Sequence, residues 1–193
     1  SGKTTVTRLL YRLYDPTHGL IRLGNEAQAP DIRTVPLAAL RGRIGMVTQD
    51  VQLFQASVRD NLTFFDSTIT DQRILDVIAL LEMEEWFRRL PHGLDSELQS
   101  EGNSLSAGEA QLLAFMRVFL HAPDLVILDE ASSRLDPATE RLIERAVDKL
   151  LAGAHGPRTA IIIAHRLATV QRADHLVILQ DGRIQEQGPR HQL

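Results

Sequence analysis

The sequence predicts an α/β fold built on a mainly parallel sheet, and three observations support this prediction. Strand-like and helix-like segments alternate through the second half of the chain. Two of the strand-like runs, 125–128 and 160–163, are entirely apolar, which is typical of strands covered on both faces. The 193 residues are 44% hydrophobic and 24% charged, the composition of one globular domain. We therefore expect these two runs to be central strands.

The N-terminal part of the chain predicts one helix and two short strands. Apolar spacing indicates a helix over 3–14, and an Asp-Pro pair directly after it ends the pattern. Short strands are expected over 20–23 and 44–47, with a polar loop that contains two prolines between them. A helix therefore begins almost at the first residue.

A helical insert is expected next. Between 70 and 89 the apolar residues recur with helical spacing, which predicts one or two amphipathic helices with Thr70 or Asp71 as the cap. A turn over 91–93 closes the insert. Beyond it the pattern predicts a helix, a strand, a helix, a strand, a short helix and two strands, over 106–120, 125–128, 137–151, 159–164, 167–171 and around Val177 and Ile184.

Composition excludes several classes of protein. The 21 Lys and Arg against 25 Asp and Glu give a formal net charge of −4, which argues against a general nucleic-acid binder, since such proteins need a basic surface. The absence of cysteine excludes disulfides and thiolate metal sites. The apolar runs are far shorter than the ~20 residues of a membrane span, and no signal-peptide pattern opens the chain. Because the chain begins at Ser1 without a methionine, we expect it to be a piece of a longer protein.

A phosphate-binding motif stands at the start of the first predicted helix. Gly2, Lys3 and Thr4 match the end of the loop G-x-x-x-x-G-K-[ST]. In that loop, backbone N–H groups and the positive helix end bind phosphate oxygens, the lysine reaches the β- and γ-phosphates, and the hydroxyl holds Mg²⁺. So short a match also fits an ordinary exposed helix start.

Two carboxylates follow the apolar run 125–128. In a parallel sheet this run delivers Asp129 and Glu130 to the carboxyl edge, where α/β proteins bind ligands. Asp129 would then hold a metal ion, and Glu130 would polarise an attacking water. The alternative is that both carboxylates follow the strand into solvent and help the next turn.

Two further helix starts carry capping signals. Ser106 and Glu109 have the S-x-x-E spacing of a capping box, and Asp136 followed by Pro137 fits a simple helix cap. A helix start with a hydroxyl and small side chains that leave the backbone N–H groups accessible also suits a phosphate. Ser106 can therefore act as a cap, as a ligand-binding residue, or as both.

Taken in order, these motifs resemble the nucleotide-binding domain of an ABC transporter. The residues that carry the resemblance are Gly2-Lys3-Thr4, Gln49, Leu105-Ser106-Ala107-Gly108-Glu109, Leu128-Asp129-Glu130, Asp136 and His165. The flanking segments 54–62 and 164–170 resemble the exporter type. The resemblance covers nearly the whole chain. It implies a P-loop core over 1–62 and 121–193 and a helical subdomain over 63–120.

The resemblance also implies where the chain is cut. On this interpretation it begins inside its own Walker A motif, so that the N-terminal strands of the P-loop core and the aromatic residue that stacks on adenine are missing. We expect the fragment alone to bind nucleotide poorly.

By the same resemblance the chain contributes to a site for ATP and Mg²⁺. Glu130, Gln49 and His165 would be catalytic, and Thr4, Gln49 and Asp129 would hold the metal ion. The residues implied in nucleotide binding are Ser1, Gly2, Lys3, Thr4, Thr5, Gln49, Ser106, Gly108, Asp136 and His165. A surface glutamine and a histidine satisfied at a strand end are the plain alternatives for Gln49 and His165.

Three positions depart from the family pattern. Ala107 stands where glycine is usual, Glu109 where glutamine is usual, and Met116 where alanine is usual before Arg117. If position 107 needs a positive φ, alanine costs about 1 kcal/mol relative to glycine. An altered signature beside an intact Lys3 and Glu130 is compatible with an asymmetric heterodimer.

The function implied is ATP hydrolysis that powers export across a membrane. The expected partners are a second nucleotide-binding domain, in a homo- or heterodimer arranged head to tail, and a transmembrane domain of the same or another chain, with no nucleic acid. The domain would then lie at the cytoplasmic face of the cell membrane. Two alternatives are a soluble ABC ATPase acting on ribosomes or DNA, and an interaction module that binds nucleotide but hardly hydrolyses it.

Overall fold

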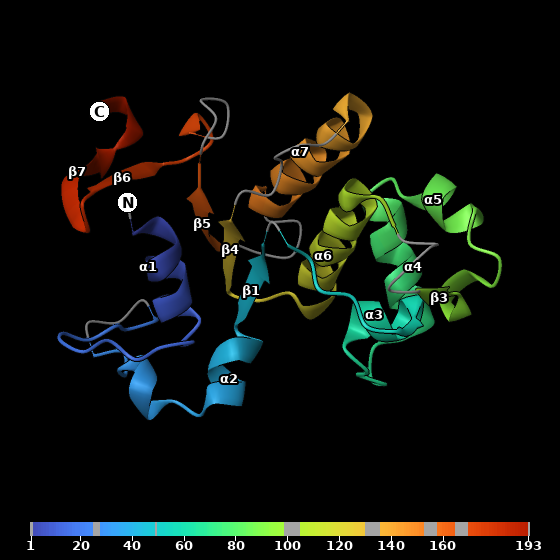
Figure 1. The fold of residues 1–193 in the computed structure, drawn as a ribbon, viewed down its shortest axis with the longest axis horizontal. Coiled ribbons are helices and arrows are strands. Elements are labelled where there is room, and N and C mark those ends of the chain that lie inside the picture. The colour runs from blue at the N-terminus through green and yellow to red at the C-terminus, as the bar shows by residue number, and fades with distance from the viewer. Residues whose placement is uncertain are drawn as a thin grey trace.

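The structure is a computed structural model that describes residues 2–24, 28–48, 50–98, 105–129, 136–152, 158–164 and 170–192. Figure 1 shows a central sheet between two groups of elements, with the first helix and a C-terminal hairpin on one side and a cluster of helices on the other. Among the described residues, no helix combines the length and apolarity needed to cross a bilayer.

The sheet consists of three parallel strands in the order β1–β4–β5. These are β1 (Ile44–Val47), β4 (Leu125–Asp129) and β5 (Thr159–Ile163). The prediction that 125–128 forms a central strand is confirmed. The same prediction for 160–163 is wrong within the described residues, where β5 lies at the edge and pairs with β4 alone. An apolar run indicates that both faces of a strand are covered, but it does not indicate whether the strand is paired along one edge or along both.

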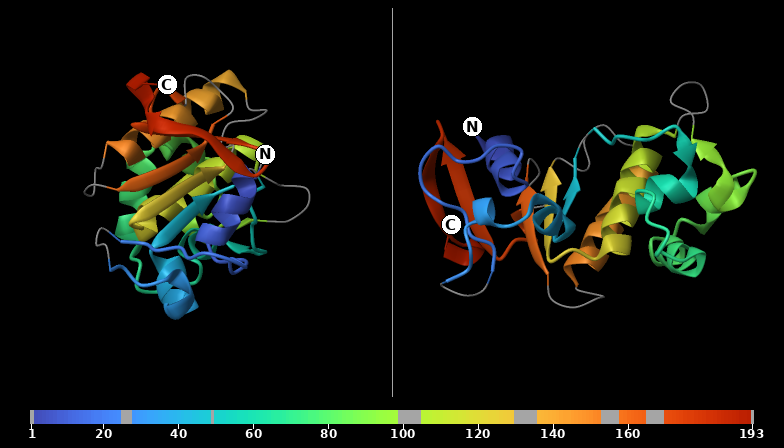
Figure 2. Two further views of the ribbon diagram at one scale, coloured as in Figure 1. Left: turned by 90° about the vertical axis from the view of Figure 1, so that its left-hand side faces the viewer. Right: turned by 90° about the horizontal axis from the view of Figure 1, so that it is seen from below.

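Both faces of the sheet are covered, as the apolar strands predict. Val126 and Leu128 of β4 point into a core shared with α6 (Ala107–His121) and α7 (Pro137–Leu151). Leu125 and Ile127 point to the opposite face, against residues of α1 (Lys3–Leu10), η1 (Ile32–Thr34) and α2 (Leu37–Gly42). Figures 1 and 2 show these two layers on either side of the strands.

A cluster of short helices packs against α6. It contains α3 (Val58–Thr63), α4 (Asp71–Leu80), α5 (Glu84–Arg88) and η2 (Gly93–Asp95), with the two-residue strands β2 (Ala56–Ser57) and β3 (Glu97–Leu98). Phe115 and Phe119 of α6 are fully buried in its core. The predicted cap at Thr70 is confirmed, since its side chain accepts from the Arg73 N–H at 3.3 Å.

The chain ends in an antiparallel hairpin. β6 (His175–Gln180) and β7 (Arg183–Pro189) pair with each other, and η3 (Arg190–Gln192) follows. Asp181 and Gly182 form the turn and both have positive φ, at 49° and 74°, which is the conformation a tight two-residue hairpin turn requires. A Cβ on Gly2 would lie 3.8 Å from the Gly182 Cα, so this turn lies beside the start of α1.

Most predicted elements agree with the structure. The helix over 137–151 and the strand over 44–47 are confirmed at the predicted boundaries, and the helices over 70–89 and 106–120, the strands over 125–128 and 159–164 and the two C-terminal strands agree within a few residues. Most of the predicted short helix over 167–171 lies outside the described residues.

Two predictions near the N-terminus are wrong. The first helix ends at Leu10 rather than at residue 14, because Arg12 takes a positive φ of 52° and donates to the carbonyl oxygens of Ile32 and Val35 at 3.1 and 2.9 Å. These long-range bonds override the local helical pattern. The segment 20–23 forms only an isolated bridge between Arg22 and Asp31, although Ile21 and Leu23 still pack into the core on that face of the sheet.

Candidate functional site

The carboxyl ends of the three parallel strands lie next to one another. Val47 of β1 is paired in register with Leu128 of β4, and Asp129 of β4 is paired with Ile163 of β5. The predicted metal ligand Asp129 is therefore the last residue of the central strand and is half-buried. This edge is where α/β proteins bind ligands.

Four predicted site residues, Ser1, Gln49, Glu130 and His165, lie outside the described residues. Along the chain, however, Gln49 comes two positions after the end of β1, Glu130 directly after β4, and His165 two positions after β5. The three strand ends that lead to these residues are adjacent in the sheet.

The start of α1 has the geometry of an anion site. Gly2, the N-cap residue, has a positive φ of 87° and, as a glycine, has no side chain with which to cap the first N–H groups of the helix. Lys3 is half-buried in the first turn, and Thr4 and Thr5 are exposed. Uncapped N–H groups at a positive helix end are the groups that bind phosphate oxygens. The residues present therefore fit a nucleotide phosphate.

The start of α6 is a complete capping box. The Glu109 N–H donates to the Ser106 hydroxyl at 3.2 Å, and the Ser106 N–H donates to a Glu109 carboxylate oxygen at 2.9 Å. The other Glu109 oxygen accepts from Arg89 at 2.9 Å. The extra negative charge at position 109 is thus directed to its own helix start and to a cation.

Ala107 needs no glycine-like backbone. It is the first residue of α6 and does not have a positive φ. The penalty of about 1 kcal/mol that a positive φ would impose on alanine therefore does not arise.

Gly108 is required by close packing between two helix starts. A Cβ at this position would lie 2.2 Å from Cγ2 of Thr139 in the first turn of α7. The cap of α7 is Asp136, whose carboxylate accepts from the Ala138 and Thr139 N–H groups at 3.0 Å each. Hydrogen bonds from Thr139 and from these backbone N–H groups lower the pKa of the Asp136 carboxyl. The structure therefore brings Ser106, Gly108 and Asp136 together at neighbouring helix starts.

The Gly108→Ala substitution is expected to destabilise the protein by about 1–3 kcal/mol, the usual cost of overpacking a tight contact. Thermal unfolding measures this cost, as a fall in the melting temperature of roughly 2–4 °C per kcal/mol. Gly42→Ala in α2 is the matched control, because a Cβ there meets nothing within 4 Å. Thr139→Ala in the Gly108→Ala background removes Cγ2 and should restore part of the lost stability. No restoration would contradict the packing explanation.

Side chains of α6 and α3 hold the segment that follows position 49. Arg117 of α6 is buried, with 8% of its surface exposed, and donates to the carbonyl oxygens of Asn61 and Gln52 at 2.7 and 2.9 Å. The Asn61 amide in turn bonds the backbone of Phe54, Ala56 and Ser57. Gln111 of α6 donates to the Thr48 carbonyl oxygen at 3.4 Å.

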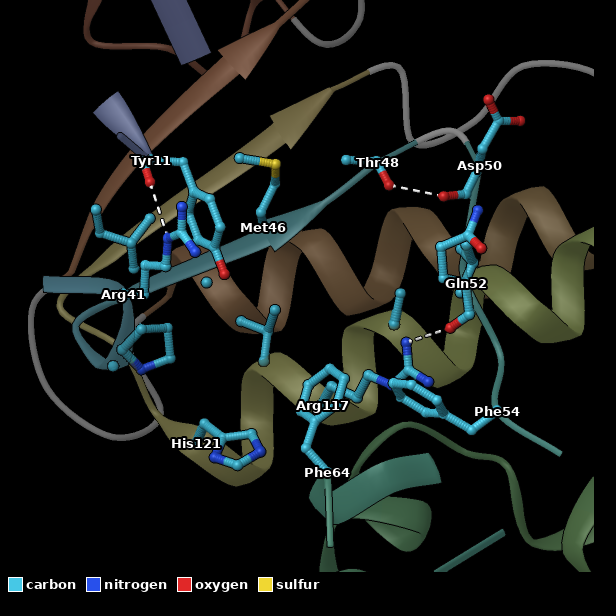
Figure 3. Close-up of a pocket in the computed structure, with 17 residues that line it drawn as sticks. Tyr11, Arg41, Met46, Thr48, Asp50, Gln52, Phe54, Phe64, Arg117 and His121 are labelled. Atoms are coloured by element: carbon cyan, nitrogen blue, oxygen red, sulfur yellow. Dashed lines mark hydrogen bonds between the residues drawn. The ribbon is translucent and has the colours of Figure 1, made fainter. Parts of the chain in front are cut away.

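A cavity of about 550 Å³ lies beside this segment (Figure 3). Its lining comes from α2, β1, α6 and the described residues of the segment 48–54, with Tyr11, Phe64 and Pro123, and includes the cations Arg41 and Arg117. Of the predicted site residues that the structure describes, none lines it. Sequence patterns did not indicate this cavity, because its lining residues come from several separate segments. The one local signal was Arg117, a charged residue inside the apolar run of α6.

The mouth of the cavity carries exposed aromatic rings. Phe54, Phe64 and Phe65 are 44%, 50% and 60% exposed, and the Phe54 ring makes edge contacts with the other two at 6.2 and 5.7 Å between centroids. Phe64 and Phe65 both have positive φ, at 53° and 64°, which costs a bulky residue about 1–2 kcal/mol. Backbone strain of this kind is concentrated at functional sites.

Comparison with known proteins identifies the family. A model of the ABC transporter family matches residues 1–133. The heterocyst differentiation ATP-binding protein HepA of Nostoc sp. is 38% identical over 193 residues, which is 100% of this chain and 30% of that protein. The ATP-dependent lipid A-core flippase of Chromobacterium violaceum is 38% identical over 192 residues, again 100% of this chain and 31% of the flippase.

A solved structure shares the fold. The chain matches a bacterial Atm1-family ABC exporter with ATP bound at a TM-score of 0.84 and 33% identity, over 99% of this chain and 32% of the exporter chain. The chain thus spans about a third of the length of the relatives that it matches. These findings confirm the predicted fold class and the resemblance carried by the motifs. The chain belongs to the ABC transporter family and corresponds to the ATP-binding domain of the exporters in that family.

Proposed function

We propose that this domain binds ATP with Mg²⁺ and hydrolyses it to power the export of a substrate across a membrane. The observation that carries the proposal is that two features lie toward the same side of the sheet. The start of α1 lies on the side to which the strands of the parallel sheet point, and the three strand ends that lead to Gln49, Glu130 and His165 are adjacent on that side (Figures 1 and 2).

Each residue has a distinct role in this proposal. Lys3 and the first N–H groups of α1 bind the phosphates, and Thr4, Gln49 and Asp129 hold Mg²⁺, which neutralises charge that develops on the phosphoryl oxygens. Glu130 orients and polarises the attacking water, and His165 stabilises charge near the γ-phosphate.

The proposed partner is a second ATP-binding domain, identical or homologous, packed head to tail. Ser106 and Gly108 would contact the nucleotide bound by the partner domain. Asp136 would lie near the interface between the two domains. The ordinary backbone at Ala107 and the engaged carboxylate of Glu109 support a usable signature. A division into a P-loop core over 1–62 and 121–193 and a helical subdomain over 63–120 is part of this proposal. The packing of α4 on α6 supports it, whereas α3, which also packs on α6, favours a boundary before residue 58.

The Lys3→Ala substitution tests nucleotide binding directly. We expect the affinity for ATP to fall by roughly 10-fold or more, because one charge-assisted contact to phosphate is worth about 1.5–3 kcal/mol. Calorimetry on the protein assembled with its transmembrane partner measures the affinity. Arg8→Ala is the matched control, since Arg8 is an exposed cation in the last turn of the same helix. Equal losses in the two variants would overturn the phosphate role of Lys3.

The cavity beside segment 48–54 is the proposed docking place for a transmembrane domain, with the ATP-binding domain at the cytoplasmic face of the membrane. Its exposed aromatic rim and strained backbone support contact with an apolar helix of that partner. Thr48 and Asp50, which line the cavity, are the neighbours of position 49 in the chain, so a docked partner would touch the chain next to the proposed ATP site.

The Phe54→Ala substitution tests this docking. We expect the substrate-stimulated part of the ATPase rate to fall by roughly 5-fold, because an aromatic anchor at an interface contributes more than about 1 kcal/mol. The unstimulated rate should change by less than about 2-fold. Leu75→Ala on α4 is the control, as another exposed apolar residue that does not line the cavity. Unchanged stimulation in the Phe54 variant would contradict docking at this mouth.

A further inference from the structure

We propose that Gln111 and Arg117 are positioning residues, which hold from α6 the two flanks of the chain segment that carries Gln49. The inference rests on the proposed function, in which Gln49 acts on Mg²⁺ and the attacking water. It adds two residues of α6 that act only through the backbone that they bind.

Gln111 holds the upstream flank. Its side chain is buried, with 4% of its surface exposed, and its Nε2 donates to the carbonyl oxygen of Thr48, one residue before position 49. Because buried polar groups keep their hydrogen bonds, this bond from the buried Gln111 amide restrains the end of β1, which leads to Gln49.

Arg117 holds the downstream flank at three residues after position 49. Its Nη1 donates to the Gln52 carbonyl oxygen at 2.9 Å and its Nε to the Asn61 carbonyl oxygen at 2.7 Å. The guanidinium also lies 4.7 Å from the centre of the Phe64 ring. Figure 3 shows the bond from Arg117 to Gln52 at the wall of the cavity.

The chemistry of Arg117 argues against a role in simple ion pairing. No carboxylate of the described residues pairs with it, and its partners are backbone carbonyls, the Asn61 amide oxygen and a ring face. Burial lowers the pKa of Arg117 to about 10, so the group is still protonated at neutral pH. A buried charge satisfied mainly by loop carbonyls fixes the path of that loop.

The two contacts together restrain both the position and the direction of the backbone at position 49. Gln111 and Arg117 are six residues apart on one rigid helix, which spaces them by about 9 Å along its axis. Thr48 and Gln52, which they hold, flank position 49 on either side. Ser106 caps the start of the same helix, so the signature and the flanks of position 49 are bound to one element.

A double-mutant cycle separates positioning from simple support of the fold. Arg117→Lys keeps the charge but loses the forked donors, and Gln111→Met keeps the shape but loses the donor. Each is made alone and with Gln49→Ala, in the protein assembled with its transmembrane partner. The measurements are kcat, the KM for ATP, the Mg²⁺ concentration for half-maximal rate, and the melting temperature.

We expect Arg117→Lys to lower kcat by about 10-fold with less than a 2-fold change in the KM for ATP, and to raise the Mg²⁺ requirement. In the Gln49→Ala background the same substitution should change kcat by less than about 2-fold, because the group that it positions is gone. Gln111→Met should also lower kcat only when Gln49 is present, by a smaller factor. It provides the same test if the Arg117→Lys variant fails to fold.

The control is Arg73→Lys, since Arg73 also donates to a backbone carbonyl of α6, that of Phe119 at 3.4 Å, but does not contact the segment beside position 49. It should leave kcat and the Mg²⁺ requirement unchanged. If Arg117→Lys or Gln111→Met lowered kcat by the same factor with and without Gln49→Ala, the inference would be overturned. An unchanged kcat in Gln49→Ala would overturn it together with the role of Gln49, whereas the Glu130 and Lys3 variants report separately on hydrolysis and binding.

Discussion

The Glu130→Gln substitution is expected to lower the ATPase rate by about 100-fold or more while ATP still binds. A positioned general base typically contributes 10²–10⁴-fold to a rate, and glutamine keeps the size of the side chain but loses the basic carboxylate. The position follows directly after β4, the central strand, whose last residue Asp129 lies between the ends of β1 and β5. The steady-state rate is measured in the protein assembled with its transmembrane partner, together with the affinity for ATP.

The matched control is Glu84→Gln, which makes the same chemical change at an exposed position in the first turn of α5. It should leave both rate and affinity within about 2-fold. A wild-type rate in Glu130→Gln would show that another group activates the water. A wild-type protein that binds ATP but scarcely hydrolyses it would favour the interaction module over the transporter ATPase.

The elements that could be predicted from sequence are those whose pattern is locally consistent. The helix over 137–151 has Asp136 as its cap, proline at its first position and an apolar stripe, and all three signals agree with the fold. The strand over 125–129 is buried on both faces, so composition alone indicates it. In contrast, the end of the first helix depends on bonds from Arg12 to residues about twenty positions away, which no local pattern contains.

The site residues also differ in whether the sequence could predict them. Motifs indicated Lys3, Ser106 and Asp129 because phosphate and metal chemistry demands particular residue types at fixed spacing. Gly108 was indicated as a nucleotide contact, but its packing against Thr139 depends on the approach of two helices and could not be predicted. Likewise, the contacts of Arg117 with segment 52–61 join residues more than fifty positions apart.

The Asn61→Leu substitution is expected to lower the free energy of unfolding by about 4 kcal/mol, with a fall in melting temperature of roughly 10 °C. Asn61 is fully buried, and its amide donates to the carbonyl oxygens of Phe54, Ala56 and Ser57 at 3.0, 3.3 and 3.0 Å and accepts from the Phe54 N–H at 2.8 Å. Leucine has similar volume but removes these bonds, in which the two amide N–H groups are shared among three carbonyls, and also the bond from Arg117 Nη2 to Oδ1 at 3.4 Å. Several buried polar groups then lose a partner, each at a cost of about 1 kcal/mol or more.

Thr63→Val is the control on the same helix. Thr63 is also buried, but its hydroxyl makes a single bond, to the Arg59 carbonyl oxygen at 3.0 Å, so valine should cost about 1 kcal/mol. Thermal unfolding of both variants compares the loss of one hydrogen bond with the loss of several at a neighbouring site. An Asn61 variant no less stable than the Thr63 variant would show that the backbone of segment 54–57 finds other partners. The ordered path of that segment, and with it the wall of the cavity, would then not depend on the Asn61 amide.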